Sequence, residues 1–266
     1  MMTIDKYLRP ATLEEAYAAA QKKNSVILGG MLWLRLGNRR IGTAIDLAGL
    51  VPDTVDTTGG MIRIGAYTTL RTLETHAGLN GLADNVFRDA VRSIVGVQFR
   101  NLATIGGSIF GRFGFSDVMT VFLALDASAE LYKTGTVTLE DFCGMGRVND
   151  ILTHVILPDE PVTASYAAQR NTATDFPVLN TCAVLRGNRL TVTVGARPLG
   201  AVPYRYALDS GLSAEAVAEE IAGRTVFASN TRASEEYRRH LCRVLVRRTV
   251  ADVLKRSAEK TVKEEN

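Results

Sequence analysis

The first feature of the sequence that could do chemistry is a glycine pair at the end of an apolar segment. In ILGGMLWLR (27–35), a strand-like apolar run leads into Gly29 and Gly30. Because glycine has no side chain, a ligand can approach the backbone of such a turn, and successive exposed N–H groups can bind an anion. The pair predicts either a phosphate-binding turn or a tight turn without a ligand.

A second glycine pair lies in ATIGGSI (103–109). Thr104 and Ser108 flank Gly106 and Gly107, so this segment offers hydroxyl groups as well as backbone N–H groups to phosphate oxygens. Neither pair has the spacing of a Walker loop or of the Rossmann glycine motif. Two such turns, expected in separate subdomains, indicate a long dinucleotide held between them.

The third candidate is Asp117, which stands directly before the apolar segment VMTVFLALDA (118–127). That segment predicts a buried helix. A carboxylate at this place can cap the helix, or it can accept hydrogen bonds from the hydroxyl groups of a ribose. The residues alone leave both roles open.

The composition limits the classes of protein to which the chain can belong. It has 266 residues, of which 46% are hydrophobic and 22% charged, and a formal net charge of +3. These values are typical of a globular protein with one large domain or two modest ones. Acids accompany the basic residues at 235–250, which favours a charged helix surface over nucleic-acid binding. No apolar run approaches the roughly 20 residues of a membrane span.

Cysteine and histidine usage argues against a metal centre on this chain. Cys143, Cys182 and Cys242 are far apart and odd in number, so neither a disulfide framework nor a metal or iron–sulfur site is expected. The histidines stand in unrelated contexts and are expected to be surface or packing residues. We expect a reducing, cytoplasmic location, and no secretion signal because residues 1–16 lack an apolar stretch.

Apolar periodicity and capping residues predict a mixed set of helices and strands. The first fifty residues are expected to form one helix followed by two strands, at 12–23, 25–30 and 43–50. Further elements are expected as helices at 82–94, 118–127, 213–223 and 232–256, a hairpin within 176–198 and a frayed tail beyond 256. Thr12 and Ser213 are predicted N-caps. Pro158 and Pro161 precede the change to hairpins and indicate a boundary.

Several stretches together resemble a known family. VGVQFRNLATIGGSIFGRFGFSDVMTVFLALDA (95–127) resembles the segment V-G-x-x-Q-I-R-N-x-A-T-I-G-G-N, with a following S-D pair, of the FAD-binding subunits of molybdenum hydroxylases. VILGGMLWL (26–34) resembles their A-G-G-T-D-L turn, and ASNTRASEEYRRHLCRVLVRR (228–248) resembles their C-terminal segment. IDLAGL and IGAYTTLRTLE match further blocks in the same order. The family includes subunits of xanthine dehydrogenase, carbon monoxide dehydrogenase and nicotinate dehydrogenase.

The resemblance implies an α+β chain with two parts. The first would be the two-subdomain FAD-binding fold of the vanillyl-alcohol-oxidase/p-cresol-methylhydroxylase type, at 1–164 with subdomains at about 1–56 and 57–164. The second would be a small α+β C-terminal domain at 165–266, in which helices accompany an antiparallel sheet.

The resemblance also implies a set of FAD-binding residues. The two turns would hold the pyrophosphate through Leu28, Gly29, Gly30, Met31, Leu32, Thr104, Gly106, Gly107 and Ser108. Asp117 would bind ribose or ribityl hydroxyl groups, Ile94 and Val95 would lie near the isoalloxazine ring, and Leu152 would be a further apolar contact.

The chain departs from the family pattern at a few positions. Met31 and Leu32 stand where relatives carry Thr and Asp, and Ser108 stands where they carry Asn. Ala167 or Ala168 occupies the place of a Lys that many relatives have.

The implied function is that of an FAD-binding electron-transfer subunit of a molybdenum-containing hydroxylase or dehydrogenase. A large partner subunit would carry the molybdenum cofactor, and a small partner subunit would carry two [2Fe–2S] clusters. Electrons would pass through FAD to NAD⁺ or another acceptor, so no side chain is assigned as a catalytic acid or base. The alternatives are a non-catalytic assembly subunit with a weakened FAD site, suggested by Met31 and Leu32, and a stand-alone flavin reductase on the same fold.

Overall fold

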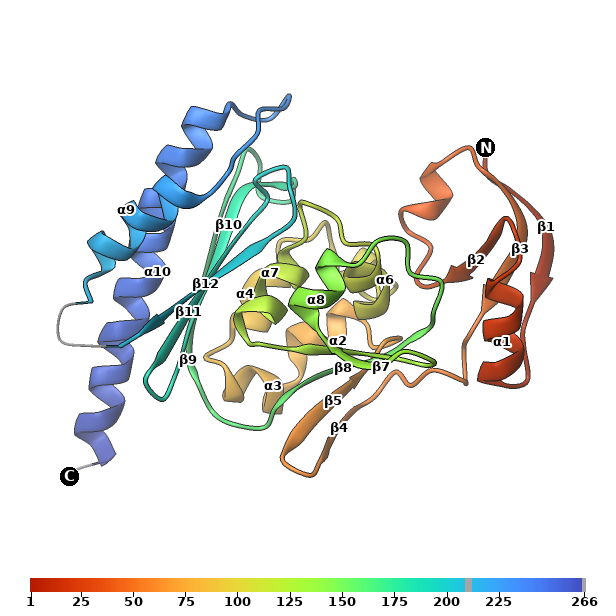
Figure 1. Cartoon of the computed structure of the whole chain (residues 1–266), viewed down its shortest axis with the longest axis horizontal. Helices are drawn as coiled ribbons and strands as arrows, with labels where there is room; N and C mark the ends of the chain where they lie inside the picture. Colours follow the sequence, from red (N-terminus) through yellow and green to blue (C-terminus); the bar gives the residue numbers. More distant parts are fainter. Residues whose placement is uncertain (209–211, 265–266) are drawn as a thin grey trace. The chain divides into compact units, whose positions relative to one another are not determined.

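The computed structural model describes residues 1–208 and 212–264, and these form three β-sheets with helices around them (Figure 1). The chain divides into two compact units, each assembled from separate stretches. The first unit consists of Met1–Thr72, Val97–Gly111 and Ala127–Asp159, and the second of Leu73–Gly96, Arg112–Asp126 and Glu160–Asn266. The expected α+β class is confirmed, and the domain boundaries expected at 56 and 164 stay predictions.

The N-terminal sheet of the first unit has three parallel strands in the order β1 (Thr3–Leu8), β3 (Arg40–Asp46) and β2 (Ser25–Leu28). Strand β1 corrects the expected order of one helix and two strands. Its residues are almost all exposed, so they give no apolar alternation by which a strand could be predicted.

Helix α1 (Leu13–Ala20) connects β1 to β2 and begins with the predicted capping box. Thr12 Oγ1 accepts a hydrogen bond from Glu15 N at 3.1 Å, and Glu15 Oε2 accepts one from Ala11 N at 2.8 Å. The N-cap predicted at Thr12 is therefore confirmed.

The second sheet of the first unit is antiparallel. Its strands are, in order, β4 (Val55–Thr58), β5 (Met61–Gly65), β8 (Leu152–Pro158), β6 (Ser128–Leu131) and β7 (Gly135–Thr138). The short helices of this unit are η1 (Leu34–Leu36), α5 (Val97–Arg100), α6 (Ile105–Phe110) and α8 (Leu139–Gly144). Helix α6 packs on β8, and the rings of Phe110 and Phe142 lie 5.8 Å apart.

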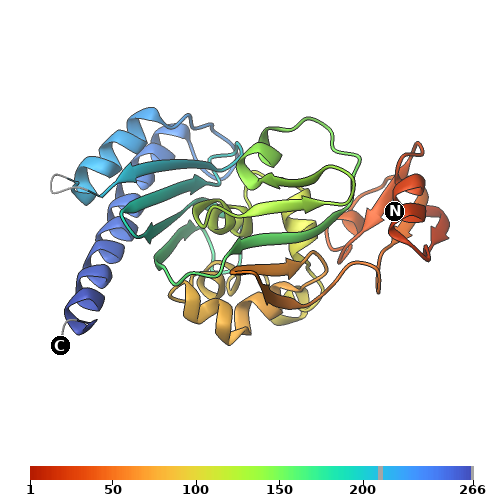
Figure 2. The same cartoon turned by 60° about the horizontal axis from the view of Figure 1, so that its bottom comes forward.

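The second unit is built on one antiparallel sheet (Figure 2). Its strands are, in order, β12 (Val202–Ala207), β11 (Arg189–Gly195), β10 (Pro177–Arg186) and β9 (Thr163–Arg170). Helices α9 (Ala214–Arg224) and α10 (Glu235–Glu264) pack on one face, and α7 (Asp117–Ala124) packs on the other (Figure 1). Because both faces are covered, β10 is buried along nearly its whole length.

Three expectations in this unit meet different outcomes. The hairpin is confirmed, because Arg186 pairs with Arg189 across the turn between β10 and β11. Ser213 is confirmed as an N-cap, since its hydroxyl accepts from Ala216 N at 3.1 Å. The helix expected at 82–94 is present but shorter, as α4 (Val86–Val91), because the chain is interrupted between it and α3 (Ala77–Leu82).

The interruption is explained by backbone geometry. Asp84 and Asn85 have φ values of 48° and 67°, in the left-handed region that no right-handed helix contains. Asn80 supports this turn, since its Nδ2 donates to Leu73 O at 2.9 Å and its Oδ1 accepts from Arg88 N at 3.0 Å.

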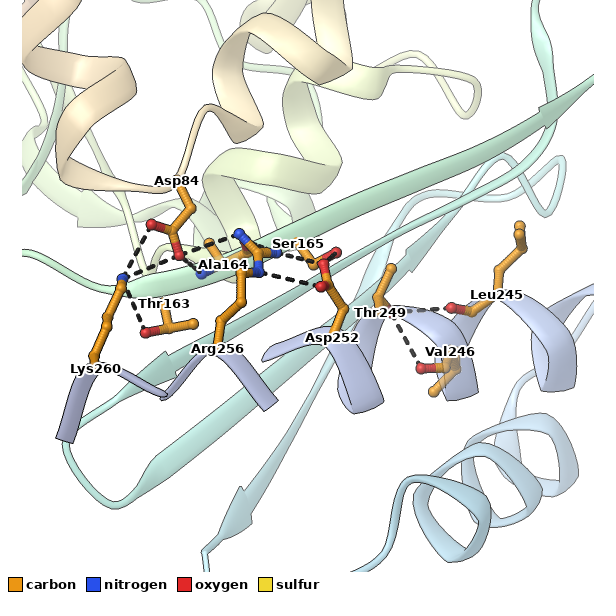
Figure 3. Close-up of polar contacts among 10 residues, drawn as sticks. All are labelled: Asp84, Thr163, Ala164, Ser165, Leu245, Val246, Thr249, Asp252, Arg256 and Lys260. Carbon is orange, nitrogen blue, oxygen red and sulfur yellow. Dashed lines mark hydrogen bonds and ion pairs between the residues drawn. The ribbon is translucent and has the colours of Figure 1, made fainter. Parts of the chain in front are cut away.

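Asp84 also fixes the last turns of α10 (Figure 3). Lys260 Nζ lies 3.0 Å from Asp84 Oδ1, and Arg256 Nη1 lies 3.3 Å from Asp84 Oδ2. Ala164 N, in β9, donates to Asp84 Oδ2 at 3.1 Å. These contacts explain why residues 257–264, which were expected to fray, continue the helix.

No helix within the described ranges 1–208 and 212–264 has the length and apolar character that crossing a membrane requires.

Candidate functional site

Both glycine turns lie in the first unit, and the segment that follows β5 holds the first of them through Tyr67. The Oη of Tyr67 donates to Leu28 O at 2.5 Å and accepts from Leu47 N at 3.0 Å. Leu28 ends β2 and Leu47 follows β3, so Tyr67 joins the carboxyl ends of two parallel strands. Burial is the main cause that raises the pKa of Tyr67 to about 12, so the hydroxyl keeps its proton at neutral pH.

The same segment holds the second turn through its backbone. Gly106 N donates to Ala66 O at 2.7 Å, and Ile105 N donates to Thr68 O at 2.9 Å. A Cβ atom at Gly106 would lie 2.7 Å from Ala66 O, so a larger residue would force the two segments apart. Residues 66–69 therefore position both turns.

The two glycine turns meet within the first unit. A Cβ atom at Gly30 would lie 1.9 Å from Leu102 O, and one at Gly29 would lie 2.9 Å from Thr104 Oγ1 and 3.8 Å from Gly107 Cα. Gly29 and Gly107 are both exposed, so the contact between the turns reaches the surface. The two turns therefore lie in contact, and their joint binding of a dinucleotide stays a prediction.

The first turn presents unused backbone donors. The N–H groups of Gly30, Met31 and Leu32 donate no hydrogen bond to any residue that the structure describes. A helical turn starts here, since Arg35 N donates to Met31 O at 3.0 Å, and the N–H groups at the start of such a turn have no partner within it. Met31 itself has a φ of 60°. Three consecutive N–H groups can therefore receive an anion.

The side chains of Met31 and Leu32 do not obstruct these donors. Leu32 is buried, and Met31 packs against the small apolar cluster formed by Leu28, Ile41 and Ala44. The departures from the Thr-Asp pattern of the family therefore add apolar contacts below the turn and leave its backbone N–H groups in place.

The second turn differs, because its N–H groups already have partners. Thr104 is the N-cap of α6, and its Oγ1 accepts from Gly107 N at 3.1 Å. Ser108 N and Ser108 Oγ both donate to Thr104 O, at 3.1 Å and 3.0 Å. The donors expected at Gly106, Gly107 and Ser108 are thus engaged within the chain.

Asp117 is buried at the start of α7 in the second unit, where side chains of the same unit surround it. Its Oδ2 lies 2.9 Å from Arg170 Nη2, and its Oδ1 accepts from Asn180 Nδ2 at 2.8 Å and from the hydroxyl of Tyr166. Ser116, not Asp117, caps α7, since its Oγ accepts from Met119 N at 3.1 Å. The cap role is therefore wrong for Asp117, and the ribose role stays a prediction.

The charge of Asp117 affects its neighbours. Burial, and next the nearby carboxylate, hold the pKa of Tyr166 well above its usual range, so Tyr166 acts as a hydrogen-bond donor. Burial works to lower the pKa of Arg170, but the charge of Asp117, the hydroxyl of Tyr166 and the hydrogen bonds to both together outweigh it, and the pKa is raised. Arg170 and Asp117 thus form a buried ion pair.

The remaining predicted residues are distributed over both units. Ile94 and Val95 follow α4 in the second unit, and Val95 is half exposed with a φ of 50°, which is rare for a β-branched residue. Leu152 is buried at the start of β8 in the first unit.

Sequence reasoning missed two features of the site. Tyr67 stands within the block IGAYTTLRTLE that resembles the family, and its role depends on hydrogen bonds to segments that are distant in sequence. Trp33 lies directly after the first turn, is 41% exposed, and makes an edge contact with Phe99 at 6.2 Å between ring centroids. An aromatic residue next to a glycine pair was the available signal.

The role of Tyr67 leads to a testable expectation. Tyr67→Phe leaves Leu47 N and Leu28 O without their partner, so we expect the free energy of unfolding to fall by about 1–3 kcal/mol in urea titrations. Tyr132→Phe is the matched control, because its hydroxyl donates to the exposed Glu14 carboxylate at 2.9 Å and joins no buried backbone groups among the described residues. An equal loss in both variants would contradict the positioning role of Tyr67.

Among the described residues, no three His, Cys, Asp or Glu side chains gather where they could hold a metal ion. The family model described as the FAD-binding domain in molybdopterin dehydrogenase matches residues 2–160. This range is more than half of the chain and includes both glycine turns and the segment 66–69. The chain belongs to this family of FAD-binding domains, which confirms the expected family and FAD as its cofactor.

Individual relatives match nearly the whole chain. The medium subunit of nicotine 6-hydroxylase from Paenarthrobacter nicotinovorans is 26% identical, with 93% of this chain and 96% of the relative covered. The xanthine dehydrogenase FAD-binding subunit of Escherichia coli is also 26% identical, with 96% and 97% covered. A chain in the carbon monoxide dehydrogenase structure from Hydrogenophaga pseudoflava aligns with a TM-score of 0.81 at 20% identity, covering 94% and 97%. The last match shows the same fold, including the C-terminal sheet unit.

Proposed function

We propose that this chain is the FAD-binding electron-transfer subunit of a molybdenum-containing hydroxylase or dehydrogenase. The observation that carries the proposal is the row of unpaired N–H groups at Gly30, Met31 and Leu32, beside the exposed Gly29 and Gly107. A pyrophosphate carries two negative charges and needs donors and close backbone approach, which this place offers.

The two turns fit FAD to different degrees, because the backbone donors of the first turn are unpaired among the described residues and those of the second are engaged. The N–H groups of the first turn would donate to the pyrophosphate, and the hydroxyl of Thr104, which already accepts from Gly107 N, could donate its own proton. When bound, FAD supplies the redox chemistry that links iron–sulfur clusters to a hydride acceptor. The contribution of the chain is to bind and orient it.

The partners are proposed from the names of the relatives. A medium subunit implies larger and smaller chains, and molybdopterin dehydrogenase is the class named for the matching family. We propose a large subunit with the molybdenum cofactor and a small subunit with [2Fe–2S] clusters that deliver electrons to FAD. NAD⁺ or another acceptor would receive them, and the cytoplasm is the expected compartment.

The two alternative functions, an assembly subunit and a stand-alone flavin reductase, can be distinguished from this one. The assembly-subunit alternative depended on Met31 and Leu32, and the unpaired N–H groups at these residues favour FAD binding instead. A stand-alone flavin reductase would reduce its flavin with NAD(P)H in the absence of partner subunits, so anaerobic addition of NAD(P)H to the isolated chain distinguishes it.

The proposal is tested on the purified chain. We expect visible flavin absorbance, or its appearance after FAD is added, and release of FAD rather than FMN on denaturation. A colourless protein that takes up no FAD would overturn the proposal.

Gly107→Ala tests whether FAD lies against the second glycine turn. The added methyl group would meet only Thr104 Oγ1, at 3.2 Å, so the free energy of unfolding should change by less than about 1 kcal/mol. Because the methyl group would stand on an exposed turn, FAD affinity should fall about tenfold, or about 1.4 kcal/mol, in fluorescence titrations. Gly144→Ala is the control, since among the described residues no atom outside its own helix backbone and chain neighbours lies within 4 Å of its Cβ position. Unchanged FAD affinity in Gly107→Ala would remove the second turn from the site.

A further inference from the structure

Three side chains converge on one carboxylate oxygen in the antiparallel sheet of the first unit. Glu130 Oε2, in β6, lies 2.5 Å from Arg63 Nη2 in β5. The same oxygen lies 2.6 Å from His154 Nδ1 and 3.0 Å from Thr153 Oγ1, both in β8. Because two acceptors would repel each other at 2.6 Å, the Nδ1 atom of His154 carries a proton toward the carboxylate. We name these four residues the Glu130 cluster.

The carboxylate of Glu130 is ionised within this cluster. Thr153 is buried, and the other three side chains are partly buried. Partial burial works to raise the pKa of Glu130, but Arg63, Thr153 and His154 together outweigh it, and the pKa is lowered. Hydrogen bonds to an ionised acceptor are stronger than those between neutral groups. The carboxylate therefore holds its three donors firmly at neutral pH.

The cluster lies at an irregularity of strand β8. Glu130 pairs with His154, whereas Leu131 pairs with Leu152. Thr153 is therefore the extra residue of a β-bulge, a feature that bends a strand and redirects its groups. Its Oγ1 lies 3.0 Å from Glu130 Oε2 and 3.1 Å from Glu130 O, so the residue opposite the bulge also fixes it.

The backbone of the bulge supports the glycine turns. Thr153 O accepts from Ala66 N at 2.9 Å, where the chain leaves β5 and enters residues 66–69. Ala66 O in turn accepts from Gly106 N at 2.7 Å, in the second glycine turn. A path of contacts thus runs from the Glu130 carboxylate through Thr153 and Ala66 to Gly106, and all of it lies within the first unit.

We propose that Glu130 is a positioning residue, whose carboxylate fixes the bulge at Thr153 and thereby sets the place of residues 66–69 and of the glycine turns. The inference rests on the proposed FAD function, because these turns are the groups that would receive the pyrophosphate. A site whose supporting groups are already fixed loses less binding free energy to ordering them when the ligand arrives.

The first test needs no FAD. Amide hydrogen exchange of the FAD-free chain reports on the N–H groups of Ala66 and Gly106, which are the backbone donors of the path. In Glu130→Gln we expect both to exchange about tenfold faster, because a neutral amide holds the bulge less firmly. The N–H groups of α1 should keep their rates, since a general loss of stability would accelerate them as well.

Glu14→Gln is the matched control in the same unit. One oxygen of Glu14 likewise receives a cation and a hydroxyl, from Lys133 Nζ at 2.5 Å and Tyr132 Oη at 2.9 Å. None of these three side chains has a contact with residues 66–69 among the hydrogen bonds and ion pairs of the described residues. The same chemical change should therefore leave the exchange of Ala66 and Gly106 unaltered.

The second test measures FAD binding by fluorescence titration of the folded variants. FAD affinity should fall about tenfold in Glu130→Gln, equivalent to about 1.4 kcal/mol. Thr153→Val is a milder variant, because valine keeps the branched shape and removes the hydroxyl that joins the bulge to Glu130. It should also weaken FAD binding, and the double variant should lose about as much as Glu130→Gln alone, since both changes interrupt one path.

Three results would each overturn the inference. They are equal exchange of Ala66 and Gly106 in Glu130→Gln and Glu14→Gln, equal acceleration of the α1 amides, and losses of FAD affinity that add in the double variant. If the unchanged chain takes up no FAD, the proposed function fails, and the exchange rates still decide whether Glu130 holds the turns.

Discussion

Replacing Gly30 by alanine should separate the two glycine turns and remove most FAD binding. The new methyl group would lie 1.9 Å from Leu102 O and 2.7 Å from the carbonyl carbon of the same residue, and backbone atoms cannot rotate away as a side chain can. We expect the free energy of unfolding to fall by about 3 kcal/mol, at the upper end of the usual cost of overpacking. FAD affinity should fall about 100-fold, equivalent to about 2.7 kcal/mol, because the row of N–H donors is displaced.

The measurements for Gly30→Ala are urea denaturation of the FAD-free protein and fluorescence titration with FAD. Gly144→Ala serves again as the control in the same unit, because its added methyl group meets no atom of any other described segment within 4 Å. If Gly30→Ala keeps both the stability and the FAD affinity of Gly144→Ala, the close packing of the two turns does not form the site.

Replacing Asp117 by asparagine should destabilise the chain even when no FAD is present. The amide would place an NH₂ group or a neutral oxygen against Arg170, and would leave an arginine side chain that is only 9% exposed without its counter-charge. Breaking a buried ion pair from one side costs about 3–5 kcal/mol, because the remaining charge stays desolvated. We therefore expect a loss of about this size in the free energy of unfolding of the FAD-free protein.

This expectation separates two roles for Asp117. If its carboxylate serves mainly to bind ribose hydroxyl groups, Asp117→Asn should weaken FAD binding and leave the stability of the FAD-free protein unchanged. Asp53→Asn is the control, because Asp53 is exposed and its loss should change stability by less than about 0.5 kcal/mol. Calorimetric unfolding of both variants without FAD gives the answer.

The elements that the sequence predicted well are those whose signal is local. The capping box at Thr12, the cap at Ser213 and the hairpin at 186–189 each depend on residues a few positions apart, and each is present. The elements it missed depend on distant partners. Strand β1 forms by pairing with β3, and the break at Asp84 and Asn85 is held by contacts from β9 and α10.

The candidate site shows the same division. Glycine pairs and flanking hydroxyl residues mark the two turns, because bare backbone has a compositional signature. Composition cannot predict which of these N–H groups lack a hydrogen-bond partner, since that depends on the acceptors that the fold brings near. The second turn matches the family pattern more closely, yet its N–H groups are engaged by Ala66, Thr68 and Thr104, while the altered first turn keeps free donors.

The sequence by itself determined the family, the cofactor and the two glycine turns, because each of these follows from residue types and their order along the chain. Only the tertiary structure decided that residues 66–69 hold both turns, that Asp117 is enclosed by Arg170, Tyr166 and Asn180, and that the free donors lie at Gly30, Met31 and Leu32. The physical reason is that a backbone or carboxylate group has no fixed role in the sequence. Its role is set by which complementary group folding places within hydrogen-bond distance, and those partners are tens of residues away.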